Sequence, residues 1–207
     1  MSQAILIDIG GVLIPGYLPA AAADWSARLG ISPRSFLGAL FGGNDDQVLV
    51  GRVSEASWWG VVGERLQAGP DVITELRRDL ASRESWDGAL VACLRRLRGH
   101  ALTAVVSNTW PGMRARMAAA GLLDIVDEIV LSCEAGYAKP DARIYATALQ
   151  RLGADPRDAL FIDDTKIYVA AAEKLGMTGH LHTSTADTIT RIDCFLAPRV
   201  SLLRGRD

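Results

Sequence analysis

The sequence predicts an α/β fold, in which helices surround a parallel β-sheet and a further set of helices is inserted after the first strand. Short apolar runs alternate with longer stretches of helical periodicity, as in a sheet buried on both faces. The first run ends at Ile9 and the second begins at Leu102. That separation far exceeds the roughly 30 residues of a strand–helix–strand unit, so it indicates an insertion.

Five short apolar runs are predicted to form the strands. Their length and their content of β-branched residues favour buried strands over helices. They cover residues 4–9, 102–106, 128–131, 159–162 and 178–182.

The long interval after the first strand contains helical patterns, which we interpret as an inserted helical cap. Four helices are expected there, at residues 20–29, 33–40, 55–66 and 73–81. Ser32 and Ser54 suit N-cap positions, and Pro33 suits a first helical turn. The predicted division is therefore a core of residues 1–15 and 86–207, with a cap of residues 16–85.

Further helices are predicted between the later strands. They cover residues 87–98, 111–120, 140–152 and 167–175, and a short helix is expected after Thr185. Pro140 is placed in a first helical turn. Three of these helices are followed by Gly121, Gly153 or Gly176, and glycine commonly terminates a helix.

Composition excludes several classes of protein. Hydrophobic residues make up 49% and charged residues 22% of the chain, which is typical of a globular protein and not of a disordered one. No apolar run approaches the ~18 residues of a transmembrane helix, and the beginning MSQAILIDIGG lacks the basic segment of a signal peptide. A net charge of -2 argues against broad binding to nucleic acid or to anionic membranes.

Cysteine usage indicates the compartment. Cys93, Cys133 and Cys194 are an odd number without a close pair, so neither a disulfide framework nor a zinc cluster is expected. We expect each to be a small buried residue in a cytoplasmic protein.

Polar residues stand where the predicted strands end. Asp8, Ser107, Asp163 and Asp164 occupy such places. Carboxyl ends of parallel strands share one edge of the sheet, and ligands bind there. Each residue alone could merely cap the following helix, but their coincidence with Lys139 favours a site.

Four segments together resemble the signature of the haloacid dehalogenase-like hydrolase superfamily. They are residues 8–13 (DIGGVL), 107–109 (SNT), 139–141 (KPD) and 163–164 (DD). Order and spacing both fit, and the resemblance covers nearly the whole chain. Residues 132–145 and 51–54 are similar to small capped phosphatases of the glucose-1-phosphate phosphatase and soluble epoxide hydrolase N-terminal-domain type. The resemblance implies a Rossmann-like core with a cap.

The resemblance implies a magnesium-dependent phosphatase acting on a small phosphorylated metabolite. Asp8 would be the nucleophile that forms an aspartyl-phosphate, as carboxylates do in phosphoryl transfer. Mg²⁺ prefers oxygen ligands and would separate carboxylate from phosphate. Adjacent strand residues point to opposite faces, so the two neighbouring aspartates are not expected to coordinate equally. By resemblance Asp164 is the direct ligand, Asp163 supports it, and the Gly10 carbonyl is a third ligand.

The remaining motif residues would hold the phosphate. The Ser107 hydroxyl and the Asn108 backbone N–H would bind its oxygens, and Lys139 would neutralise charge in the transition state. The alternative for Lys139 is an exposed surface lysine. The chain has only two other lysines, Lys166 and Lys174, which favours the functional interpretation.

Gly10 departs from the pattern. Superfamily phosphatases usually carry an aspartate there as general acid and base, a role worth typically 10²–10⁴-fold in rate. The substrate could have a leaving group that needs little protonation, such as an acyl or anomeric phosphate. Asp45 or Asp46 of the cap could substitute as a substrate-binding acid. The protein could instead be a weak enzyme or belong to another reaction branch, although the glucose-1-phosphate phosphatase-like group tolerates glycine here.

Other branches fit less well. Phosphonoacetaldehyde hydrolases use a cap lysine, and residues 10–138 contain none. True haloacid dehalogenases use no metal and lack the terminal aspartate pair, and phosphomutases normally retain the second aspartate.

The alternative from a different class is a degenerate member that binds phosphate or a partner protein without catalysis. Gly10 favours it, as does Tyr168, which stands where relatives often have asparagine. The intact charged residues argue against it, since unpaired buried charges destabilise a fold. Trp58 and Trp59 are expected to pack the cap on the core, with the alternative that one of them lines the substrate space, and Trp110 could border the site. The chain is expected to be a monomer or a homodimer.

Overall fold

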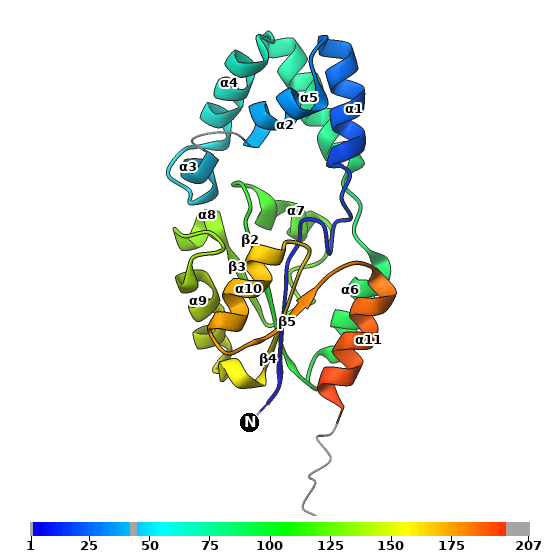
Figure 1. Ribbon diagram of the computed structural model, residues 1–207, viewed down its shortest axis with the longest axis vertical. Helices are drawn as coiled ribbons and strands as arrows, with labels where there is room; N and C mark the ends of the chain where they lie inside the picture. Colours follow the sequence, from blue (N-terminus) through cyan, green and yellow to red (C-terminus); the bar gives the residue numbers. More distant parts are fainter. Residues whose placement is uncertain (1, 42–44, 198–207) are drawn as a thin grey trace, which may run out of the picture.

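A parallel five-stranded sheet forms the centre of the molecule (Figure 1). The structure is a computed structural model that describes residues 2–41 and 45–197. The strands lie in the order β3-β2-β1-β4-β5. They are β1 (Ala4–Ile7), β2 (Leu102–Ser107), β3 (Glu128–Leu131), β4 (Ala159–Asp163) and β5 (Thr178–Leu181). The predicted α/β class is confirmed.

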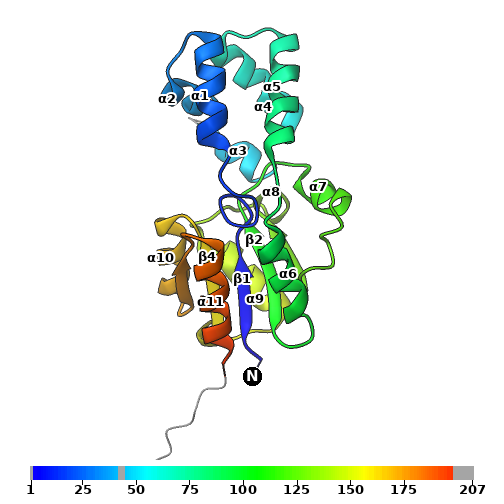
Figure 2. The same cartoon turned by 90° about the vertical axis from the view of Figure 1, so that its right-hand side faces the viewer.

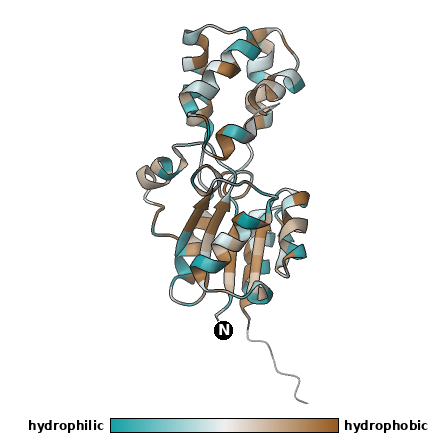
Figure 3. Cartoon of the chain, turned by 90° about the vertical axis from the view of Figure 1, so that its left-hand side faces the viewer, coloured by the Kyte–Doolittle hydropathy of each residue, from teal (hydrophilic) through white to brown (hydrophobic). Residues whose placement is uncertain are grey.

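Helices cover both faces of this sheet (Figure 1). Ile5 and Ile7 of β1 join the cluster under α6 (Gly88–Leu97), α7 (Met113–Ala119) and α11 (Thr185–Leu196). Ala4 and Leu6 join the cluster under α9 (Ala142–Leu152) and α10 (Lys166–Lys174). Alternate side chains of one strand thus enter opposite cores, and the strands are mostly hydrophobic in Figure 3.

Five further helices form a separate layer beyond the carboxyl ends of the strands (Figure 2). They are α1 (Leu18–Leu29), α2 (Pro33–Phe41), α3 (Asp45–Leu49), α4 (Glu55–Leu66) and α5 (Pro70–Arg83). This helical layer has its own hydrophobic cluster, which includes Trp25, Phe36 and Leu76. The predicted N-cap at Ser54 is present, because its side chain accepts from Ser57 N at 3.1 Å.

A close backbone approach fastens the helical layer to the core. Gly51 has φ +72°, and a Cβ there would lie 2.1 Å from the Cys133 carbonyl oxygen. Only glycine fits this conformation and this gap. The contact places the turn after α3 directly on α8 (Ser132–Ala135).

The structure differs from the predicted elements at several places. Strand β1 ends at Ile7, because residues 9–14 form a tight turn in which Ile9 O accepts from Ile14 N at 2.8 Å. Pro140 is not in a helical turn: Asp141 is the N-cap of α9, and the Lys139–Pro140 peptide is cis. The last helix, α11, has 12 residues and is not short.

The cysteines also differ from expectation. All three are free, as predicted, but only Cys93 is buried; Cys133 is half-buried and Cys194 exposed. Across the described ranges, no helix has the length and apolarity that crossing a membrane requires.

Candidate active site

Three carboxylates meet at the carboxyl edge of the sheet. Asp8 follows β1, while Asp163 ends β4 and Asp164 follows it. Oxygens of all three lie within 4.8 Å of one another. Strands β1 and β4 are neighbours, and Asp8 N donates to Ile162 O at 3.0 Å, so the backbone itself sets this spacing.

Lys139 projects into this group from the loop between α8 and α9. Its Nζ lies 2.8 Å from Asp8 Oδ1 and 2.5 Å from Asp163 Oδ2, and its side chain is fully buried. The surface-lysine alternative is therefore wrong. Burial acts to lower the pKa of Lys139, but the two carboxylates outweigh it and the net pKa is raised. The ammonium thus stays charged at neutral pH.

The two adjacent aspartates occupy different environments, as the strand alternation predicts. Asp163 is buried, holds Lys139, and accepts from Thr165 N at 2.8 Å. Burial, aided by the charge of Asp8, raises the pKa of Asp163 to about 6 against the opposing effect of Lys139. Asp164 is exposed and accepts only from the neighbouring Thr165 hydroxyl at 3.1 Å among the described residues. Asp164 is therefore free to meet a ligand.

The donor set fits a small, hard cation. Asp8 Oδ1 is buried and accepts no hydrogen bond of normal geometry within the described ranges, although it faces Lys139. A Cβ on Gly11 (φ +77°) would lie 2.0 Å from Asp164 Oδ2, so bare backbone is required beside that carboxylate. Carboxylate oxygens are the ligands that Mg²⁺ prefers. Asp8 and Asp164 suit it, with the Gly10 carbonyl in the adjoining turn.

Ser107 and Asn108 lie at the end of β2, next to this group. Ser107 is buried. The Asn108 side chain holds the main chain of Lys139 at two points: Lys139 N donates to Oδ1 at 2.7 Å, and Nδ2 donates to Lys139 O at 3.0 Å. From the sequence, only the backbone N–H of Asn108 was expected to take part, as a donor to the phosphate. No local pattern signals this clamp, because its two halves are far apart in the chain.

A second clamp joins the loop after β2 to the first residue of α8. Thr109 N donates to Ser132 Oγ at 3.0 Å, and Ser132 Oγ donates to Thr109 O at 3.3 Å. Both residues are buried. The loop after β2 is therefore fixed to the start of α8 beside the site.

Tyr168 belongs to the surroundings of Lys139. The Lys139 Nζ lies 5.0 Å from the centroid of its ring, a cation–π distance. Asn108 Nδ2 also lies 3.5 Å from its hydroxyl. Tyr168 therefore packs beside the lysine and the asparagine of the candidate site.

There is free space at Gly10, the position of the missing acid. Gly10 is exposed, its φ is not positive, and a Cβ there would meet nothing within 4 Å. The predicted substitutes Asp45 and Asp46 begin α3, but their side chains lie outside the described residues, so that role stays a prediction. Trp110, which could border the site by its place in the sequence, packs with its ring centroid 4.1 Å from that of Trp58.

Comparisons with known proteins identify the class. The profile of a hydrolase family, described as haloacid dehalogenase-like hydrolase, matches residues 3–176. The chain belongs to this family and is a hydrolase of it, which confirms the resemblance.

Particular relatives refine the comparison. The chain is 28% identical over 215 residues to bifunctional epoxide hydrolase 2 of Sus scrofa, covering 91% of this chain but 38% of that protein. It is 35% identical over 75 residues to Phosphatase MT3486 of Mycobacterium tuberculosis, covering 36% of this chain and 35% of that protein. The chain thus spans well under half the length of the pig protein.

Solved structures share the fold. A HAD family enzyme of Bacteroides thetaiotaomicron matches with a TM-score of 0.76 at 20% identity, covering 92% of this chain and 98% of that chain. Another structure of that enzyme is a complex with magnesium and inorganic phosphate; it matches with a TM-score of 0.70 at 21% identity, covering 89% and 96%.

Proposed function

We propose that the protein is a magnesium-dependent phosphatase that hydrolyses a small phosphorylated metabolite through an aspartyl-phosphate on Asp8. The observation that carries this proposal is the buried Asp8 carboxylate, paired with Lys139 and within 4.8 Å of two further carboxylates. The phosphatase named among the relatives supports it, as does the solved relative that holds magnesium and phosphate.

The reaction needs two displacements at phosphorus. A carboxylate oxygen of Asp8 attacks the phosphorus, the bond to the leaving oxygen breaks, and the leaving group departs with the electron pair. Water then attacks the same phosphorus, which releases inorganic phosphate, returns a proton to solvent and restores the Asp8 carboxylate. The Ser107 hydroxyl and Asn108 N–H hold the phosphoryl oxygens, and Lys139 offsets their charge.

Asp8, Asp164 and the Gly10 carbonyl would hold Mg²⁺, with Asp163 in support. When bound, the cation supplies positive charge between the carboxylate and the phosphate. Since Asp163 is tied to Lys139, its part is to keep that ammonium in place between the two carboxylates.

The helical layer acts in this proposal as a cap of residues 16–85 over a core of residues 1–15 and 86–207, and Asp45 and Asp46 bind substrate there. The free cysteines accord with a cytoplasmic location. The partner is a small metabolite, without nucleic acid or membrane, and the protein works as a monomer or a homodimer.

The test is phosphate release from para-nitrophenyl phosphate with Mg²⁺, with EDTA and with the variant Asp8→Asn. Asp8→Asn is nearly isosteric, so the fold should persist while turnover is abolished. The matched control is Asp71→Asn, an exposed carboxylate of α5. Equal rates for Asp8→Asn and the wild-type protein would contradict the mechanism. An inactive wild-type protein that still binds phosphate would support the non-catalytic alternative.

A further inference from the structure

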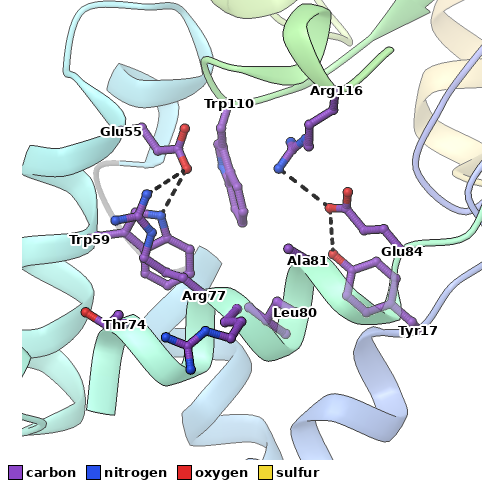
Figure 4. A pocket seen from close by; sticks show the side chains of 11 residues that line it. Tyr17, Glu55, Trp59, Thr74, Arg77, Leu80, Ala81, Glu84, Trp110 and Arg116 are labelled. Carbon is purple, nitrogen blue, oxygen red and sulfur yellow. Dashed lines mark hydrogen bonds and ion pairs between the residues drawn. The ribbon is translucent and has the colours of Figure 1, made fainter. Parts of the chain in front are cut away.

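A second pocket lies between the helical layer and the core, on the side where the chain crosses between them (Figure 4). Its volume is about 330 Å³, which suits a small ligand. Tyr17 and Glu84, from the two crossing segments, line one side, and Trp110 and Arg116 enter from the core. None of the candidate catalytic residues lines it.

The arginines of this pocket are weakly paired. Arg77 lies 3.5 Å from Glu55 and Arg116 lies 3.7 Å from Glu84, whereas Arg114 on the core surface lies 2.7 Å from its glutamate. Both pocket pairs therefore exceed the distance of a strong charge-assisted hydrogen bond.

Two observations show unused donors. The Nε of Arg116 is buried and has no acceptor within the described ranges. Arg78, also in the lining, is exposed and has no ion pair with any described residue. Buried donors are normally satisfied, so the orphaned Nε calls for an acceptor that the chain does not supply. With three arginines against two glutamates, the lining favours an anion.

The pocket also presents aromatic faces. In Figure 4 the Trp110 ring projects into it between Glu55 and Arg116. Opposite, the Arg77 guanidinium lies 5.5 Å from the Trp59 ring centroid. Flat rings and planar guanidinium groups both stack on planar ligands.

We propose that this pocket binds a small planar aromatic acid, separately from the phosphate site. Its carboxylate pairs with the exposed guanidinium of Arg78, and its ring stacks on Trp110. Because the walls come from both layers, the bound acid bridges the helical layer and the core.

The test is calorimetric titration of the protein with naphthoate, with naphthalenemethanol as the neutral control. We expect saturable binding of the acid and roughly 10-fold weaker binding of the alcohol, since hydrogen bonds to charged groups are the stronger ones. Arg78→Gln should weaken naphthoate binding by roughly 10-fold, because it removes one such bond. Arg78 is exposed, so this variant should fold normally. The control Arg34→Gln, an exposed arginine of α2 outside the pocket, should bind like the wild-type protein.

A repeat titration with Mg²⁺ and excess inorganic phosphate tests whether the pocket is separate from the phosphate site. This part of the test rests on the proposed function. Unchanged affinity is expected. Competition by phosphate would overturn a second site. Three results without phosphate would overturn the proposal: no saturable binding of naphthoate, equal affinity for the acid and the alcohol, or equal affinity of Arg78→Gln and the wild-type protein. These results are independent of whether the protein is a phosphatase.

Discussion

Gly10 decides which substrates the proposed phosphatase can use. Asp8, Lys139 and Ser107 can assist attack at phosphorus, but no side chain at position 10 can protonate the departing oxygen. A poor leaving group must then depart as an alkoxide. Acyl, aryl or anomeric phosphates should therefore be hydrolysed much faster than simple alkyl phosphates. Rates across a series of phosphates with graded leaving-group pKa measure this. If the chemical step limits turnover and the rate does not depend on the leaving group, another acid acts. Asp45→Asn and Asp46→Asn would then identify it.

The same glycine can be tested by restoring the carboxylate. The space beyond Gly10 is open and its φ is not positive, so Gly10→Asp should fold without strain. We expect a flatter leaving-group series, with a gain on alkyl phosphates of up to ~10². Gly10→Asn, which has the shape but no acid, is the control. Equal gains for both variants would contradict an acid–base role.

Asn108 holds the main chain of Lys139, in addition to the contact with phosphate proposed for its backbone N–H. Removing its side chain in Asn108→Ala frees the Lys139 main chain, so the ammonium loses its fixed place between Asp8 and Asp163. We expect kcat to fall by roughly 10²-fold, since small misplacements of catalytic groups cost that much. Ser132→Ala is the matched control, because it breaks the neighbouring clamp on Thr109 without touching Lys139. We expect Ser132→Ala and Asn108→Ala to lose similar stability, and Ser132→Ala to lose far less kcat. Equal losses of kcat in the two variants would refute the assignment.

Among the structural elements, α6 depends on one carboxylate. Asp87 Oδ1 accepts from Ala89 N and Leu90 N at 2.9 Å each, and Oδ2 accepts from the Thr185 hydroxyl at the start of α11. Burial acts to raise the pKa of Asp87, but these hydrogen bonds outweigh it and the net pKa is lowered. The ionised Asp87 thus joins two helices that pack on the same face of the sheet.

Asp87→Ala should lower the free energy of unfolding by about 1–2 kcal/mol at pH 7, the usual loss of an N-cap. Since the folded pKa lies below the unfolded value of about 3.9, the contribution is complete above that pH and is lost as pH falls through the folded pKa. Asp87→Asn keeps a capping oxygen and should lose less at pH 7, with a shallower decline in acid. Urea unfolding at pH 7 and at a pH below the folded pKa measures these free energies. The same loss of stability in acid for the wild-type protein and Asp87→Asn would contradict the assignment.

Element types were predictable where the sequence has a local period, and so were some boundaries, such as those of α4 and β3. Buried runs such as the one at β3 predicted their strand, because parallel strands need apolar side chains on both faces. Helices α3 and α8 are too short to show a period, and they were missed. Pro140 was misplaced because proline suits both a first turn and the residue before an N-cap. In the site, strand ends predicted which carboxylates meet, but the partner of Asn108 depends on tertiary contacts.

Across the whole molecule, the helical layer and the sheet have separate hydrophobic clusters. Among the described hydrophobic residues that pack against the helical layer's cluster, Trp110 comes from the core, and Tyr17 comes from the first crossing segment and also packs against a cluster of the sheet. The Trp110 ring lies 5.7 Å from that of Phe41 and 4.1 Å from that of Trp58. Trp110 and Tyr17 therefore link the helical layer to the core, and the Gly51 contact supplies a further link through backbone.

Trp110→Ala should loosen the helical layer while leaving the sheet intact. Trp110 forms aromatic pairs with Phe41 of α2 and with Trp58 and Trp59 of α4. Aromatic pairs contribute about 0.5–1.5 kcal/mol each beyond burial, so losing these three should speed hydrogen exchange in α2 and α4 by roughly 10-fold or more. Exchange in β1 and β4 should stay unchanged, because their clusters do not include Trp110. Leu123→Ala, at an exposed leucine of the core, is the control and should leave α2 and α4 unaffected. Equal acceleration in both layers would mean that they open as one cooperative unit, and then the helical layer could not move over Asp8 independently of the sheet.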